Sequence, residues 1–218
     1  MVNFSTSEEN YLKAIYHLQT EHDTVATNTL AAELKTRPAS ITDMMKKLSA
    51  KKLLNYTPYY GFTLNEQGKK AALNIIRRHR LWEYFLSEKL GFSWNEVHSV
   101  AEELEHVSDK NLIDKLDAYL GFPQFDPHGD PIPNSKGKMQ SSKTVTLDNL
   151  PLNQPAVVTR VSNRSNDLLE LLQEKSISIG TTIEVKKQFD FDHSLSVRIK
   201  GKTETISEAL SKTIYVKL

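Results

Sequence analysis

The sequence predicts a mainly α-helical protein with a smaller β component, and three observations support this fold class. Apolar residues recur at helical spacing over most of residues 5–120. A stretch rich in Pro, Gly, Ser and Lys follows at residues 121–142 and is typical of a loop or linker. From residue 143 onward, short alternating apolar runs predict a small antiparallel β-barrel. We therefore expect three domains, over residues 1–73, 74–140 and 141–218.

The composition is that of a globular protein, with 39% hydrophobic and 25% charged residues among 218. The lack of cysteine excludes disulfides, iron–sulfur clusters, thiolate zinc sites and cysteine catalysis. No apolar run approaches the roughly 18 residues that span a membrane, and the N-terminus lacks a basic stretch followed by an apolar one. We expect a cytoplasmic protein with no membrane partner.

The first 64 residues carry the pattern of a winged helix-turn-helix. Ser5 and Glu8 fit a capping box at the start of a helix over residues 5–20. A second helix is expected at residues 27–35, and Pro38 suits the first turn of a third helix.

Alternating residues 53–64 then predict a short hairpin that turns near Tyr60 and Gly61. Helix, turn, helix and hairpin in this order are typical of DNA-binding proteins. The same fold also serves as a protein-interaction module.

The third helix has an apolar face that would anchor it on the first two helices and a polar face that could enter a major groove. The apolar face carries Ile41, Met44, Met45 and Leu48. We expect the polar face and the N-terminal end to contact DNA through Arg37, Ala39, Ser40, Thr42, Asp43, Lys46 and Lys47.

Charge is distributed unevenly along the chain. Residues 35–80 hold eleven basic and two acidic residues, whereas residues 81–120 hold nine acidic and three basic residues. The basic block favours a polyanionic partner such as double-stranded DNA, and the acidic block favours cations. Solvated helix faces would give the same two blocks.

The acidic block contains histidines and glutamates at spacings that share a helix face. His79 precedes Glu83 by four residues, and His98 precedes Glu102 by four. Glu102, Glu105 and His106 follow at spacings of three and four, whereas Glu103 points elsewhere.

Imidazole and carboxylate donors without thiolate suit Mn²⁺, Fe²⁺, Zn²⁺ or Co²⁺. We assign no role to the remaining histidines, because they are not part of such a set of donors: His17, His22, His128 and His193.

Five short runs are the expected strands of the barrel, with a helix between the second and third at residues 167–174. The expected strands are residues 144–147, 156–161, 182–187, 195–199 and 213–217.

The order of these parts resembles the diphtheria toxin repressor and manganese transport regulator family of metal-dependent transcriptional regulators. The resemblance covers the whole chain, is strongest over residues 5–135, and implies an SH3-like barrel at the C-terminus. It rests on residues 9–16, 78–83, 97–102, 105–108 and the run Pro-His-Gly-Asp-Pro-Ile-Pro at 127–133.

The resemblance also implies roles for individual residues. It assigns Asn10, Glu102, Glu105 and His106 to a primary metal site, and His79, Glu83 and His98 to an ancillary site. Glu102 stands where the iron-responsive branch has a cysteine, and a carboxylate is the harder donor, so Mn²⁺ is favoured and Fe²⁺ comes next. Lys13 stands where two-domain manganese regulators place a second-metal glutamate, and a protonated lysine cannot ligate a metal.

These features predict a metal-activated homodimer that represses metal-uptake genes by binding a palindromic operator. One alternative is a metal-dependent hydrolase with a DNA-binding arm, because the same donors could activate water. Another is a metal-independent winged-helix regulator.

Overall fold

The structure is a computed structural model that describes residues 4–20, 22–57, 61–94, 96–107, 109–140, 143–162 and 165–218. The chain divides into two compact units. The first unit comprises Met1–His79, Leu104–Asp114 and Pro133–Lys138. The second unit comprises Arg80–Glu103, Lys115–Ile132 and Met139–Leu218.

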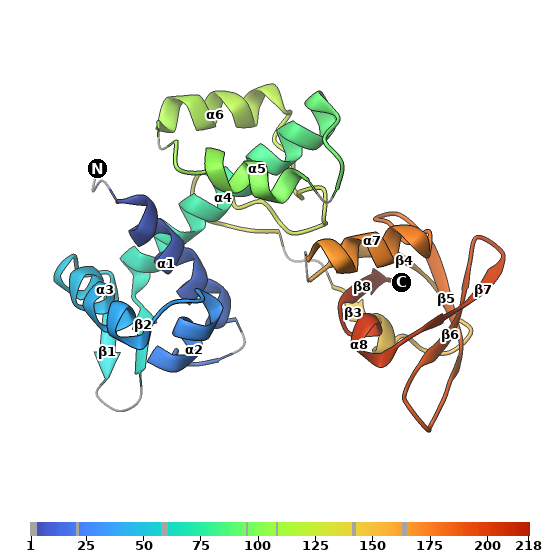
Figure 1. The fold of residues 1–218 in the computed structure, drawn as a ribbon. Coiled ribbons are helices and arrows are strands. Elements are labelled where there is room, and N and C mark those ends of the chain that lie inside the picture. Colours follow the sequence, from blue (N-terminus) through green and yellow to red (C-terminus); the bar gives the residue numbers. More distant parts are fainter. Residues whose placement is uncertain are drawn as a thin grey trace. The chain divides into compact units, whose positions relative to one another are not determined.

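A winged helix-turn-helix forms most of the first unit, as the sequence predicts (Figure 1). Its elements are α1 (Thr6–Leu18), α2 (Thr27–Glu33), α3 (Pro38–Ala50), β1 (Leu54–Thr57) and β2 (Gly61–Leu64). The expected capping box is present, since the Ser5 hydroxyl accepts from the Glu8 amide and the Glu8 carboxylate accepts from the Ser5 amide. The helices and the hairpin share one core that includes Leu12, Ile15, Leu30, Ile41, Leu48 and Phe62.

The wing is attached to the helices by a close backbone approach at Gly61. Val25 and Phe62 exchange backbone hydrogen bonds of 3.0 and 3.1 Å. Gly61 has a φ of +113°, and an added Cβ would overlap the carbonyl oxygen of Val25. Gly61 therefore begins β2, while the other part of the expected turn, Tyr60, lies outside the described residues.

Three further helices follow the wing: α4 (Glu66–Leu90), α5 (Val97–Leu104) and α6 (Lys110–Tyr119). The boundary between the two units falls inside α4, which is one uninterrupted helix of 25 residues. Within the described ranges, none of the helices combines the length and apolar character needed to cross a membrane.

The C-terminal part of the second unit is a six-stranded antiparallel sheet, which corresponds to the predicted barrel. Its strands run in the order β3-β8-β4-β5-β6-β7. They are β3 (Val145–Thr146), β4 (Pro155–Val161), β5 (Thr182–Gln188), β6 (Leu195–Ile199), β7 (Lys202–Ile206) and β8 (Ile214–Lys217).

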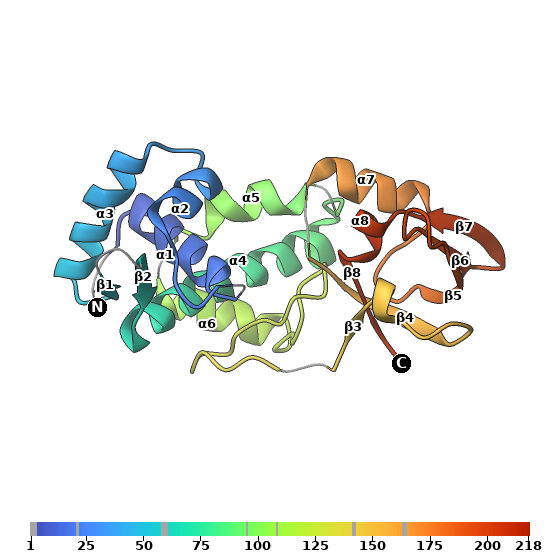
Figure 2. The same cartoon turned by 90° about the horizontal axis from the view of Figure 1, so that it is seen from below.

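Two helices cover the apolar side of this sheet (Figure 2). They are α7 (Asn166–Glu174), which the sequence predicts, and α8 (Glu208–Ser211), which it does not. Leu169, Leu172 and Leu210 from these helices are buried in one core with Val158, Val185 and Val197 from the strands. The sequence analysis also missed the edge strand β7, and the first expected strand shortens to Val145–Thr146 because Leu147–Asn149 form a 3₁₀ turn.

Replacement of Ile41 by alanine should destabilise the winged domain by about 2–5 kcal/mol, because Ile41 is fully buried and its removal leaves a cavity. Thr42→Ala is the matched control, since the adjacent Thr42 is exposed and should change the free energy of unfolding by less than about 0.5 kcal/mol. Urea denaturation followed by circular dichroism measures both variants, and equal effects would contradict the assignment of the two faces of α3.

Candidate functional site

A carboxylate with no solvent exposure lies in the middle of α4. Glu83 is 0% exposed, and its Oε1 lies 3.0 Å from Nδ1 of His98 on α5. Burial of a charged carboxylate is unfavourable unless positive charge or hydrogen-bond donors surround it. Such a group is therefore a strong indication of a functional site.

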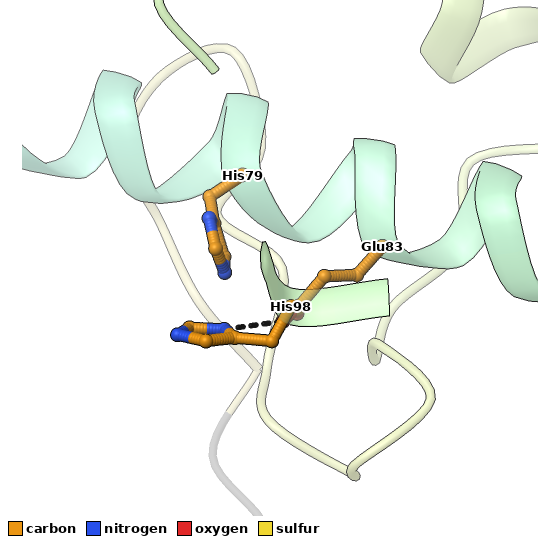
Figure 3. Close-up of side chains that lie close together, drawn as sticks. All are labelled: His79, Glu83 and His98. Carbon is orange, nitrogen blue, oxygen red and sulfur yellow. Dashed lines mark hydrogen bonds and ion pairs between the residues drawn. The ribbon is translucent and has the colours of Figure 1, made fainter. Parts of the chain in front are cut away.

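His79 lies one helical turn before Glu83 on α4, and both side chains project from the helix toward His98 (Figure 3). The three residues each offer a ligand atom within 4.8 Å of the others. This is the set that the family resemblance assigned to the ancillary site. Its assignment as a metal site stays a prediction.

A second group of potential ligands shares Glu83. Asp126 and His128, on the loop after α6, lie with Glu83 so that one ligand atom from each is within 4.8 Å of the others. All three residues are buried. The sequence analysis assigned His128 no role because it looked for partners at helical spacing; the structure shows that His128 does lie beside potential ligands, and a role in metal binding is a proposal.

His128 presents a nitrogen lone pair toward Glu83. Its Nε2 lies 3.1 Å from the backbone oxygen of Trp94, which can only accept a hydrogen bond, so we place the ring proton on Nε2. The buried Nδ1 then carries the lone pair, and it has no hydrogen-bond partner within the described ranges. A metal-ligating imidazole typically has this arrangement, with its other N–H donated to a carbonyl.

The distance between His128 and Glu83 suits a pair of ligands on one ion. Nδ1 of His128 lies 3.8 Å from Oε2 of Glu83, too far for a hydrogen bond. Two donors that each lie about 2.0–2.2 Å from a transition metal are separated by roughly 3–4 Å. The indole of Trp94 stacks on the imidazole, with ring centroids 5.6 Å apart and an interplanar angle of 16°.

The loop that carries Asp126 and His128 is held in place by its own hydrogen bonds. Asp126 Oδ1 accepts from the backbone amides of His128 and Asp130, both at 2.9 Å. Arg80 donates to the backbone oxygen of Pro131 at 2.6 Å. These contacts orient the two candidate ligands before any ion binds.

The same loop packs directly against β4. The Val161 amide donates to the backbone oxygen of His128 at 3.1 Å. Gly129 has a φ of +85°, and an added Cβ would overlap the carbonyl oxygen of Thr159, so only glycine fits. Arg160 of β4 lies 3.4 Å from Asp130, which further couples the candidate site to the sheet.

A separate cluster forms around Glu105 in the first unit. Glu105 is also 0% exposed, and its Oε1 lies 2.7 Å from Nζ of Lys13 on α1. Its Oε2 lies 2.7 Å from Nδ1 of His79. Burial raises the pKa of the Glu105 carboxyl, but the His79 imidazole and the Lys13 charge outweigh burial, so the pKa lies below its ordinary value.

Glu9 completes the cluster around Glu105, and sequence reasoning missed it. Its Oε2 lies 2.6 Å from Nδ1 of His106, and its Oε1 accepts from Arg78 at 2.6 Å. A sequence signal was available, since Glu9 adjoins Asn10 in the stretch that carries the family resemblance.

The other two residues of the predicted primary site lie elsewhere. Asn10 lines a surface pocket of about 810 Å³ beside α3, together with Ser40 and Lys47. Glu102 is about half exposed and pairs with Nε2 of His98 at 3.6 Å. The structure thus brings Glu105 and His106 together, while Asn10 and Glu102 have other neighbours.

The cluster of Glu83, Asp126 and His128 and the cluster around Glu105 differ in their fit to a metal ion. Glu83, Asp126 and His128 fit, because a buried imidazole lone pair faces a buried carboxylate. Glu105 and His106 do not fit as they stand, because the Lys13 ammonium lies on the carboxylate oxygen that an ion would need.

The polar face of α3 agrees with the predicted DNA-contacting surface in its exposure. Ile41, Met45 and Leu48 are buried. The seven residues expected to contact DNA are all exposed: Arg37, Ala39, Ser40, Thr42, Asp43, Lys46 and Lys47.

Comparison with known protein families gives three matches that together cover most of the chain. Residues 3–62 match the family described as "Iron dependent repressor, N-terminal DNA binding domain". Residues 65–134 match "Iron dependent repressor, metal binding and dimerisation domain", and residues 145–218 match the FeoA domain.

Named relatives and solved structures agree with these matches. The iron-dependent repressor IdeR of Mycobacterium tuberculosis is 30% identical over 160 residues, which is 70% of each chain. The regulator MntR of Oceanobacillus iheyensis is 34% identical over 116 residues, which is 53% of this chain and 78% of MntR.

The structure is similar to that of a manganese-dependent transcriptional repressor in complex with manganese. The TM-score is 0.87 at 33% sequence identity, over 96% of this chain and 98% of the other. The repressor ScaR with bound Cd²⁺ gives a TM-score of 0.82, also at 33% identity, over 96% of this chain and 98% of ScaR.

Replacement of Glu83 by glutamine should weaken Mn²⁺ binding by at least about 100-fold, because it removes an anionic donor that lies beside the His128 lone pair. Glu88→Gln, five residues further along α4 and exposed, should leave the affinity unchanged. Isothermal titration with Mn²⁺ measures both, and equal affinities for the two variants would show that Glu83 is not a ligand.

Proposed function

We propose that this chain, which belongs to the iron-dependent repressor family, represses transcription by binding a palindromic operator when a divalent metal fills the cluster of Glu83, Asp126 and His128. The family consists of metal-dependent transcriptional repressors, which are not enzymes, so the hydrolase alternative is excluded. The chain carries a DNA-binding domain and a dimerisation domain, and it acts as a homodimer. The buried lone pair of His128 beside Glu83 is the observation that carries the proposal.

Mn²⁺ is the metal that the donor set favours, and Fe²⁺ comes next. Oxygen donors from Glu83 and Asp126 and a nitrogen donor from His128 form a set without sulfur. Hard oxygen ligands suit Mn²⁺, and imidazole is accepted by Fe²⁺, Zn²⁺ and Co²⁺ as well. We expect Zn²⁺ and Co²⁺ to bind in vitro, in line with a ScaR structure that holds Zn²⁺.

The chain prepares this site in three ways. The Trp94 carbonyl fixes the His128 tautomer, the Asp126 turn orients the loop, and Gly129 allows the loop to contact β4. A bound divalent ion would supply positive charge to the buried carboxylates. Glu83 is on α4, and His128 is on the loop that is bonded to β4. An ion bound by both side chains would therefore connect α4 to this loop.

The metal response follows from linkage between ion binding and the DNA-binding conformation. A ligand shifts a two-state equilibrium only by the ratio of its affinities for the two states. A shift from 1:99 to 99:1 requires a ratio of about 10⁴. The proposal therefore requires that the conformation with Glu83 and His128 in their observed positions is the one that binds the operator.

Each protomer would present one α3 to one half-site, so a two-fold symmetric dimer requires a palindromic operator. We further propose that the target genes encode proteins of metal uptake.

We also propose a division of the chain into a winged domain (residues 1–73), a helical metal-binding and dimerisation domain (74–140) and an SH3-like domain (141–218).

The direct test is binding of a fluorescent palindromic duplex with Mn²⁺, with Fe²⁺, and after removal of metal by a chelator. The native protein should lose at least about 100-fold in affinity when metal is removed, which corresponds to a coupling of about 3 kcal/mol. His128→Ala should bind DNA with the weak affinity of the metal-free protein whether or not Mn²⁺ is present.

His193→Ala is the control, because His193 is on the exposed turn between β5 and β6 and should respond to Mn²⁺ as the native protein does. If the chelator leaves DNA binding unchanged, the chain is a metal-independent winged-helix regulator and the proposal fails.

Removal of one phosphate contact should reduce the salt dependence of binding. Lys47→Ala, on the exposed face of α3, should lower the slope of log affinity against log salt by about 0.9 and weaken binding to all sequences alike. Fluorescence anisotropy between about 50 and 200 mM salt measures the slope. An unchanged slope would place Lys47 outside the DNA interface.

A further inference from the structure

Lys13 links α1 to a carboxylate that is 92 residues away in the sequence. Its Nζ donates to Oε1 of Glu105 at 2.7 Å. The Glu105 side chain is 0% exposed and that of Lys13 only 16%. An ammonium group at this distance makes a charge-assisted hydrogen bond, which is stronger than a neutral one and is little screened when buried.

The contacts of His106 resemble those of a metal-ligating histidine. Its Nδ1 bonds to Glu9, so in the neutral ring Nε2 carries the lone pair. Nε2 lies 3.8 Å from Oε1 of Glu105, a distance that two ligands of one ion can have. The oxygen that would complete this pair is the one that Lys13 contacts.

The balance of charges in this cluster also argues against a bound metal ion. The buried carboxylates of Glu9 and Glu105 are matched by the cations of Arg78 and Lys13. With neutral imidazoles the four charges cancel. A divalent ion on Glu105 would add two positive charges within a few ångströms of the Lys13 ammonium, and such repulsion is large in a weakly hydrated site.

We propose that Lys13 supplies the cation at the Glu105–His106 cluster, so that α1 is tied to this segment by a protein ammonium group and the cluster binds no metal ion. Lys13 is thereby the residue that restricts metal binding to the Glu83 cluster. The proposal rests on the metal-dependent function proposed above, but it makes a separate claim about which cluster holds metal.

The test counts Mn²⁺ ions per full-length chain by equilibrium dialysis and elemental analysis. Glu105→Gln in the native background should leave the count unchanged, because no ion is bound there. Lys13→Glu should raise the count by about one ion per chain, because it removes the ammonium and adds a carboxylate beside Glu105 and His106. Lys51→Gln is the matched control, since Lys51 makes a similar pair with Glu8 at 2.8 Å and its loss should not change the count.

A loss of one ion per chain in Glu105→Gln or His106→Ala would overturn the proposal, and so would an unchanged count in a folded Lys13→Glu. If Lys13→Glu does not fold, Lys13→Gln is measured in its place. Without metal, the melting temperature of Lys13→Gln should be lower than that of the native protein. Addition of Mn²⁺ should raise the melting temperature of Lys13→Gln by more than it raises that of the native protein. Equal shifts in the two proteins would contradict the proposal.

The two proposals fail in different ways. If the native protein binds no Mn²⁺, or if its ion is unaffected by Glu83→Gln, the metal assignment under the proposed function is wrong. The gain of an ion in Lys13→Glu would still support the role of Lys13.

Discussion

The fully buried carboxylate of Glu83 is the constraint on which the candidate metal centre depends. A charge in this position is stable only if donors or cations surround it. Nδ1 of His98 lies 3.0 Å from one of its oxygens, whereas the other oxygen faces the His128 lone pair at 3.8 Å, a distance that a cation between them would suit. The position of His128 in turn requires the turn at Asp126 and the close approach of Gly129 to β4. The proposed ion between Glu83 and His128 would therefore connect α4 to a loop that is itself held to β4.

Most of the fold follows from patterns that are local in the sequence. The capping box at Ser5, the proline at the start of α3 and the apolar periodicity of α4 each indicate a helix without reference to the rest of the chain. The missed elements are those in which such signals are weak. β7 is a polar edge strand, and α8 has four residues, which is close to a single turn and too short to show helical periodicity.

The candidate site was predictable only in part, because its residues come from distant segments. Helical spacing places His79 and Glu83 on one face, but it carries no information on a loop residue such as His128, 45 positions after Glu83. The contact between Lys13 and Glu105 is a pairing of opposite charges that many other pairs in the sequence could make equally well. Neighbouring positions on a helix differ by about 100° in direction. Glu9 contacts His106, while the ligand role that the family resemblance implies for the adjacent Asn10 stays a prediction.

The most direct measurement is anomalous X-ray scattering at the manganese absorption edge from crystals of the native protein grown with Mn²⁺. The account predicts an anomalous peak within bonding distance of a Glu83 oxygen and of Nδ1 of His128, with the Lys13 ammonium still on Glu105. A peak bonded to Glu105 and His106, with none beside Glu83, would contradict it.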